Sequence, residues 1–242
     1  MGDRPTIMLV HGAWHGSWCW SAVRNSLHDE GFATAAVDNP SVTAPGSDLA
    51  ADSDNLRQAL DAVDGRVVLV GHSYGGAVIT DAGAHPKVDH LVYLTAFALD
   101  AGESVAQNGL TGGETIELGD AMTFDGDGVS VDPGRAVELF FHDCTPDVAH
   151  SACARLRPMS MAAMLGVTRN VAWREKPSTY IVCTDDRALP VALQRSCSAR
   201  TDNVLEMHTS HSPFLSRPDD LARTFAAIAL QVSSDPGTNA GG

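Results

Sequence analysis

Short runs of apolar and β-branched residues recur along the chain, each long enough for one buried strand. The runs cover residues 6–10, 33–37, 67–70, 91–94, 180–183 and 204–207. Stretches of helical length separate most of them, such as 17–30 and 49–63, in which apolar residues return every three or four positions. This alternation predicts an α/β fold with a six-stranded, mostly parallel sheet and helices on both of its faces.

The alternation stops between residues 99 and 176, where repeated glycines interrupt any long period. We therefore predict a single domain over residues 1–242, with a core of 5–98 and 177–232 and an inserted cap of 99–176. Within the cap, two apolar runs flank Asp125-Gly126-Asp127-Gly128, a turn sequence typical of a β-hairpin. The last residues, 233–242, are rich in glycine, serine, proline and asparagine, and we predict that they are disordered.

Composition and charge narrow the classes of function. With 242 residues, 44% of them hydrophobic and 19% charged, the chain has the make-up of a folded globular protein. Its formal net charge of −14 repels phosphate groups, so we expect no nucleic-acid partner. No apolar run approaches the roughly 20 residues that span a bilayer, and the N-terminus lacks a secretory signal. We therefore expect no membrane association and a cytoplasmic location.

The strongest chemical signal is a G-x-S-x-G pentapeptide, Gly71-His72-Ser73-Tyr74-Gly75. It follows the apolar run at 67–70 and opens a stretch of helical composition at 76–84. A strand-to-helix reversal of this kind strains the backbone of the central residue and exposes its side chain at the carboxyl edge of the sheet. The helix N-terminus there also favours developing negative charge. Ser73 is therefore the candidate nucleophile.

A serine hydroxyl becomes a nucleophile when a base removes its proton, and that base is usually an imidazole oriented by a carboxylate. The last apolar run leads into a loop with two histidines, His208 and His211. His208 lies close to the strand end and suits a structural role, so His211 is the candidate base. The preceding run leads into Asp185 and Asp186. We favour Asp186 as the acid because it lies further into the turn, and Asp185 remains the alternative.

A tetrahedral intermediate also needs hydrogen-bond donors for its oxyanion. We expect these to be the backbone N–H groups of Tyr74, directly after the nucleophile, and of Ala13, in the loop after the first strand. The residues expected to border the substrate are Gly12, Trp14, His15, Met159 and Trp173. The first three lie in or beside the loop after the first strand. The last two belong to a cap whose methionines and aromatic residues suit either an apolar ligand or ordinary core packing.

These features together resemble the α/β-hydrolase fold, in particular the branch that contains the plant methylesterases, related bacterial esterases and hydroxynitrile lyases. The segments that carry the resemblance are LVHGAWHGSWCW at 9–20, VGHSYGG at 70–76, LRP at 156–158 and YIVCTDDR at 180–187. The resemblance extends from about Pro5 to Leu230 and implies that the catalytic acid stands at Asp186. The chain departs from this branch in a shorter cap, in the segment 39–54 and at Ser212.

The resemblance and the candidate site predict a serine hydrolase that cleaves small to medium apolar carboxylic esters through an acyl-enzyme, with no cofactor and no metal. The lyases of the branch carry a threonine where this chain has Gly12, a glutamate where it has His72 and a lysine where it has Ser212. We therefore expect hydrolysis and not cyanohydrin cleavage. Two alternatives stay open, a lyase or cyclase on the same scaffold and a ligand-binding protein with slow turnover. The oligomeric state is also open, with a homodimer as one alternative.

Overall fold

A computed structural model describes residues 4–111 and 117–234, although the side chains of residues 110 and 111 are not described. We predicted disorder for residues 233–242, and residues 235–242 of this segment lie outside the described ranges. Its first two residues, Ser233 and Ser234, are instead the last turn of a helix, because the apolar positions of that helix continue up to them.

The six predicted strands form one sheet. They are β1 (Thr6–Val10), β2 (Thr34–Val37), β3 (Val67–His72), β4 (Val88–Leu94), β8 (Ser178–Cys183) and β9 (Asn203–Met207). Their order in the sheet is β2-β1-β3-β4-β8-β9, and every neighbouring pair is parallel. The prediction of a six-stranded, mostly parallel sheet is confirmed, and the carboxyl ends of all six strands meet at one edge.

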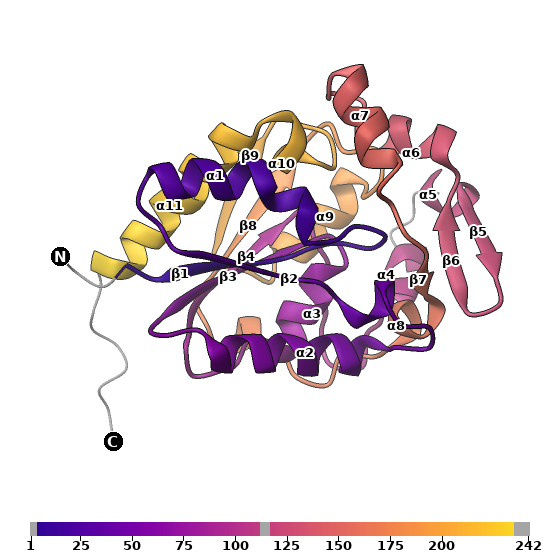
Figure 1. The fold of residues 1–242 in the computed structure, drawn as a ribbon. Coiled ribbons are helices and arrows are strands. Elements are labelled where there is room, and N and C mark those ends of the chain that lie inside the picture. Colours follow the sequence, from indigo (N-terminus) through magenta and orange to yellow (C-terminus); the bar gives the residue numbers. More distant parts are fainter. Residues whose placement is uncertain (1–3, 112–116, 235–242) are drawn as a thin grey trace.

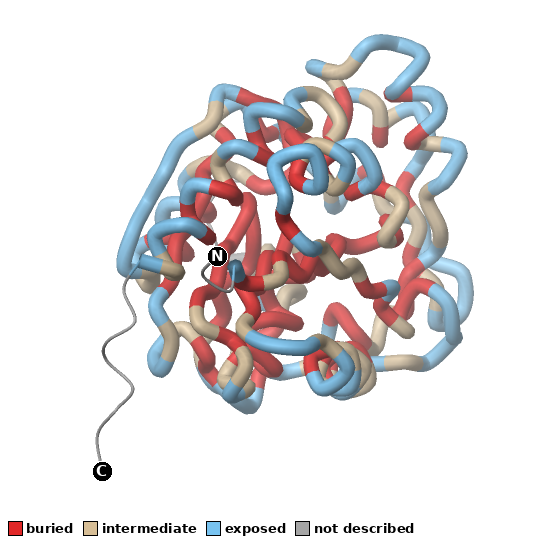
Figure 2. Tube along the Cα trace, turned by 60° about the vertical axis from the view of Figure 1, so that its left-hand side comes forward, coloured by how far each residue is buried: buried red, intermediate tan, exposed pale blue. Residues whose placement is uncertain are grey.

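Helices cover both faces of this sheet (Figure 1). One face carries η1 (Ser17–Trp20), α1 (Ser21–Asp29), α10 (Pro213–Ser216) and α11 (Pro218–Ser234). The other carries α2 (Leu49–Ala62), α3 (Gly75–Ala82) and α9 (Val191–Ser198), and η2 (Pro40–Val42) precedes α2. Alternate residues of β1 point to opposite faces of the sheet. Ile7 and Leu9 pack with α1 and α11, and Met8 and Val10 pack with α2 and α3. Figure 2 shows the buried positions gathered along the strands at the centre of the molecule.

Between β4 and β8 the chain builds a separate group of elements, and we call residues 99–176 the cap segment. Its helices are α4 (Val105–Thr111), α5 (Glu117–Asp120), α6 (Pro133–Phe140), α7 (Pro146–Cys153), α8 (Met161–Leu165) and η3 (Ala172–Arg174). Its strands, β5 (Met122–Asp125), β6 (Gly128–Val131) and β7 (Met159–Ser160), form a small antiparallel sheet. In Figure 1 the small sheet, α6 and α7 lie beyond the edge where the long strands end.

The predicted hairpin matches β5 and β6, and Gly126 adopts the positive φ of +57° that its turn requires. The strand β7 was not predicted, because a strand of two residues leaves no periodic pattern. Within the described ranges, no helix combines the length and the apolar character needed to cross a membrane.

Candidate active site

Ser73 lies in the sharp turn between β3 and α3. Its φ is +52°, in the left-handed region that non-glycine residues rarely adopt. The flanking glycines make the turn possible: a Cβ on Gly71 would lie 2.6 Å from the carbonyl oxygen of Gly75, and one on Gly75 would lie 2.6 Å from that of Val10. Ser73 is partly exposed, whereas the residues on either side of it are buried. The turn therefore presents one hydroxyl group at the carboxyl edge of the sheet.

The loops after β8 and β9 bring a carboxylate and an imidazole together at this edge. The Asp186 Oδ2 atom lies 2.6 Å from the His211 Nδ1 atom, and both side chains are buried. Asp185 is exposed, and its backbone N–H donates to the Thr209 carbonyl at 3.1 Å. Of the two aspartates considered from the sequence, the structure joins Asp186 to His211.

His208 does not join this group. It is exposed, and its Nδ1 atom lies 2.8 Å from the Thr184 hydroxyl at the end of β8. In the part of the chain that the structure describes, no group of three or more His, Cys, Asp or Glu side chains is arranged to hold a metal ion.

Four further groups donate hydrogen bonds to the Asp186 carboxylate. The Thr95 hydroxyl reaches Oδ2 at 2.6 Å, and the Gln194 amide reaches the same oxygen at 3.4 Å. The backbone N–H groups of Ala188 and Leu189 reach Oδ1 at 2.7 and 2.9 Å. Sequence reasoning missed Thr95 and Gln194. The position of Thr95 directly after β4 was the one available signal for it, and nothing in the sequence marks Gln194.

The loop after β1 lies directly against the serine. An ideal Cβ on Gly12 would lie 2.8 Å from the Ser73 Cβ atom, so only a glycine allows this approach. Within the described residues, the backbone N–H groups of Ala13 and Tyr74 have no hydrogen-bond acceptor. The Tyr74 side chain points away from the turn, and its hydroxyl donates to the buried Asp52 carboxylate at 2.7 Å.

Three of the residues expected to border the substrate are buried in the structure. Trp14, His15 and Met159 are 4%, 1% and 1% exposed. The Trp14 indole donates to the Val129 carbonyl of the cap segment at 2.9 Å and stacks on the Phe140 ring. These side chains connect the oxyanion loop to the cap segment, so they form the back of any pocket rather than its exposed wall.

Three buried histidines surround the candidate site without belonging to it. His11 and His15 donate from Nδ1 to the carbonyls of Gly12 and Ala13 at 2.7 and 2.8 Å. His72 donates from Nε2 to the His211 carbonyl at 2.9 Å. Burial lowers the pKa of His11 to about 4, that of His15 to about 3 and that of His72 well below its ordinary value. All three are therefore neutral, and their N–H groups hold the backbone on both sides of Ser73.

Trp173 is not part of this edge. It lies on η3, ahead of the amino end of β8, and its indole donates to the Leu99 carbonyl at 2.8 Å. With Pro177 and Asp202 it lines a cavity of about 360 Å³ where β8 and β9 begin. The expectation that Trp173 borders the substrate therefore does not fit its place in the fold.

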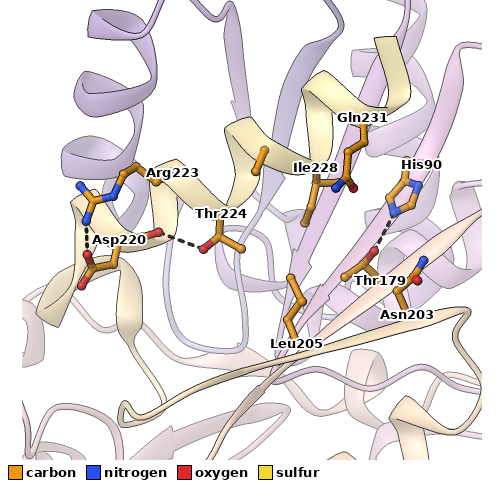
Figure 3. Close-up of a pocket in the computed structure, with 10 residues that line it drawn as sticks. His90, Thr179, Asn203, Leu205, Asp220, Arg223, Thr224, Ile228 and Gln231 are labelled. Carbon is orange, nitrogen blue, oxygen red and sulfur yellow. Dashed lines mark hydrogen bonds and ion pairs between the residues drawn. The ribbon is translucent and has the colours of Figure 1, made fainter. Parts of the chain in front are cut away.

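A larger cavity, of about 660 Å³, lies over the first halves of β4, β8 and β9, against α11 (Figure 3). Its floor includes His90 and Thr179, whose side chains lie 2.9 Å apart, and Arg223 and Asp220 form an ion pair on the helix side. None of the predicted site residues lines this cavity, which is distant from the turn that holds Ser73.

A parallel sheet with a serine raised on such a strand-to-helix turn defines a hydrolase of the nucleophile-elbow class. The chain belongs to the alpha/beta hydrolase family, whose family model matches residues 7–224. This membership confirms the fold predicted from the sequence.

Similar proteins cover nearly the whole chain. The alpha/beta hydrolase nvfD of Aspergillus novofumigatus is 29% identical over 95% of this chain and 99% of its own length. Methylesterase 1 of Arabidopsis thaliana is 29% identical over 92% of this chain and 95% of its own. The crystal structure of a pyrethroid hydrolase from Sphingobium faniae superposes with a TM-score of 0.81 at 26% identity, covering 97% and 99% of the two chains. These names agree with the predicted class of enzyme, the carboxylic ester hydrolases.

Proposed function

We propose that the protein hydrolyses small to medium apolar carboxylic esters through Ser73, His211 and Asp186. The observation that carries the proposal is the 2.6 Å contact between His211 Nδ1 and Asp186 Oδ2, at the edge where Ser73 is exposed. A carboxylate accepts a hydrogen bond from the Nδ1–H group and so fixes the imidazole tautomer. The Nε2 atom of His211 is then unprotonated and can act as a base.

The reaction follows from these groups. His211 takes the proton of the Ser73 hydroxyl through Nε2 while the serine oxygen attacks the ester carbonyl carbon. The imidazolium then protonates the departing alcohol, and the acyl group stays on Ser73. A water molecule, deprotonated by His211 in turn, releases the carboxylic acid. Asp186 stays ionised throughout, and the four other donors around it hold its position.

The oxyanion of each tetrahedral intermediate needs preorganised donors. We assign this role to the backbone N–H groups of Ala13 and Tyr74. Their lack of an acceptor within the described residues supports the assignment, because buried N–H groups are rarely left unpaired without a reason. The missing side chain at Gly12 leaves room for the acyl centre beside Ser73.

The surroundings of the site favour apolar esters. The Phe140 ring lies 5.6 Å from the His211 ring, and Trp14 also stacks on this phenylalanine. Relatives named methylesterase and pyrethroid hydrolase support carboxylic esters as the substrate class. We propose that Gly12 borders the reacting carbonyl, and that Trp14, His15 and Met159 support the pocket from behind.

The test removes the nucleophile. We expect Ser73→Ala to keep the fold and lose on the order of 10⁶-fold in kcat towards p-nitrophenyl esters, since removing a triad serine has this effect. A fluorophosphonate probe should label the parent protein at Ser73 and leave the variant unlabelled, as peptide mass spectrometry will show. Ester turnover by the alanine variant at the parental rate, or labelling at another residue, contradicts the proposed mechanism.

A further inference from the structure

The loop that carries His211 has no regular secondary structure. A backbone bond from Asp185 to the Thr209 carbonyl holds its start, and side-chain contacts hold the residues around His211. The main contact comes from Asp143, which lies in the cap segment between α6 and α7. Asp143 Oδ2 accepts the backbone N–H of Ser210 at 2.9 Å, and Oδ1 accepts the Ser210 hydroxyl in a short hydrogen bond. Ser210 itself is completely buried. One carboxylate of the cap segment therefore holds the residue directly before the candidate base.

The Ser210 hydroxyl extends this contact to the other side of His211. Its proton has two acceptors within reach, Asp143 Oδ1 and the Phe140 carbonyl at 3.1 Å, and its oxygen accepts the backbone N–H of Ser212 at 3.3 Å. The carbonyl of His211 accepts from His72, as described above. Asp143 also receives a weak contact from the Cys144 thiol at 3.9 Å, which leaves its two bonds to Ser210 intact.

We propose that Asp143 is a positioning residue for the catalytic histidine, and that it acts through Ser210. The inference rests on the proposed function, because it assigns a role in placing His211. Asp186 fixes the tautomer and tilt of the imidazole, whereas Asp143 fixes the backbone from which the imidazole projects. A base must lie within about 0.5 Å of its productive position, and a loop without ladder hydrogen bonds reaches this precision only when it is tied to a packed element. A charged acceptor with two oxygens suits the two donors of Ser210.

The same contact makes the cap segment part of the catalytic apparatus. Asp143 follows α6 by a short turn, and Phe140 at the end of α6 packs near the His211 ring. The cap segment both covers the site and sets the place of His211.

Removing the carboxylate tests the proposal. We expect Asp143→Ala to lower kcat for p-nitrophenyl acetate by about 10- to 100-fold, because a misplacement of about 1 Å has an effect of this size. KM should change less than about threefold, since the proposed role of Asp143 is to place His211 and not to bind the substrate. Asp143→Asn should restore most of the activity, because its amide can accept from the Ser210 N–H and donate to the Ser210 hydroxyl.

Asp132 provides a matched control in the same segment. Its carboxylate accepts the Arg135 N–H at 3.0 Å at the start of α6 and does not touch the His211 loop. Asp132→Ala removes a carboxylate that supports α6, so it should lower the thermal midpoint while kcat stays at the parental value. In a double-mutant cycle, the losses in Asp143→Ala and Ser210→Ala should add to less than their sum, because both changes remove the bond between the Asp143 carboxylate and the Ser210 hydroxyl.

A second readout does not depend on turnover. The hydrogen-bonded Nδ1–H of His211 should give a separate downfield proton resonance, which should broaden in Asp143→Ala and persist in Asp132→Ala. Parental kcat in a folded Asp143→Ala protein overturns the proposal, as does an unchanged resonance. If the parent protein hydrolyses no ester, the proposed function fails, and the resonance alone then decides the role of Asp143. If Asp143→Ala does not fold, the activities of Ser210→Ala and Asp143→Asn test the same contact in its place.

Discussion

The two oxygens of the Asp186 carboxylate have different partners. Oδ1 accepts two backbone N–H groups and so holds its own loop, while Oδ2 accepts from His211, Thr95 and Gln194. In Asp186→Asn the amide oxygen can take over the backbone contacts, which places the NH₂ group against the imidazole. His211 must then carry its proton on Nε2, where it cannot accept from Ser73. We expect kcat to fall by up to roughly 10⁴-fold with the fold preserved, as steady-state kinetics and circular dichroism will show.

Asp185→Asn is the control for this experiment. The residue is exposed, and the contact it makes with Thr209 uses its backbone, which the substitution leaves in place. We expect kcat within about threefold of the parent. If Asp185→Asn were the severe change and Asp186→Asn the mild one, the catalytic acid would have to be reassigned.

Single residues differ in how well sequence can predict them. Ser73, Asp186 and His211 are each placed at the end of an apolar strand, so their common edge follows from the parallel sheet. Thr95 also follows an apolar strand, but a threonine there does not by itself indicate a role, and Asp143 has no such mark. Thr95 meets Asp186 across 91 positions of sequence, and Asp143 meets Ser210 across 67. Contacts of this kind depend on how the loops and the cap segment pack, and one sequence contains no periodic signal for that packing.

At the scale of elements, the strands and the turn at Ser73 were the predictable part. Central parallel strands are buried on both faces and therefore read as continuous apolar runs. The glycines on either side of Ser73 are required by backbone contacts within the turn and with β1. The cap segment was harder, because its helices and strands are short and repeated glycines interrupt the pattern along it. Its hairpin was predictable only from the Asp-Gly turn.

Two loops decide between an esterase and a lyase of this fold. The related lyases have a threonine in place of Gly12, whose Cβ would lie 2.8 Å from both the Ser73 Cβ and the His72 Nδ1 atoms. They also have a lysine in place of Ser212, which here is buried and neutral and cannot stabilise departing cyanide. We expect the protein to hydrolyse p-nitrophenyl acetate and to release no cyanide from mandelonitrile in a parallel assay.

Cyanide release without ester hydrolysis would reverse this assignment. Turnover of neither compound by a protein whose Ser73 reacts with the fluorophosphonate probe would indicate the slow-turnover ligand-binding alternative. The same two assays on Ser73→Ala separate enzymatic turnover from spontaneous decay of the substrates.

For the whole molecule, the three neutral histidines around the site predict sensitivity to acid. In the unfolded chain each would titrate near its ordinary pKa of about 6.5, whereas burial keeps the pKa of His11 at about 4, that of His15 at about 3 and that of His72 far below 6.5. As the pH falls below about 6.5, the unfolded state binds protons that the folded state does not, so the free energy of unfolding decreases. Each histidine removes about 1.4 kcal/mol per pH unit, so the three together remove about 4 kcal/mol. Away from the site, burial also lowers the pKa of His90 to about 4, which adds a fourth contribution of the same sign.

A domain stable by roughly 5–15 kcal/mol cannot lose free energy at that rate over two pH units and stay securely folded. We therefore expect urea midpoints to be nearly constant from about pH 8 to 7 and to fall steeply from about pH 6 to 5, above the range in which most carboxyl groups titrate. His15→Gln can keep the contact with the Ala13 carbonyl while removing one of four titrating groups, so the slope of unfolding free energy against pH should decrease by about a quarter. A midpoint that stays level down to pH 5, or the parental slope in this variant, would show that these histidines take up protons within the folded protein.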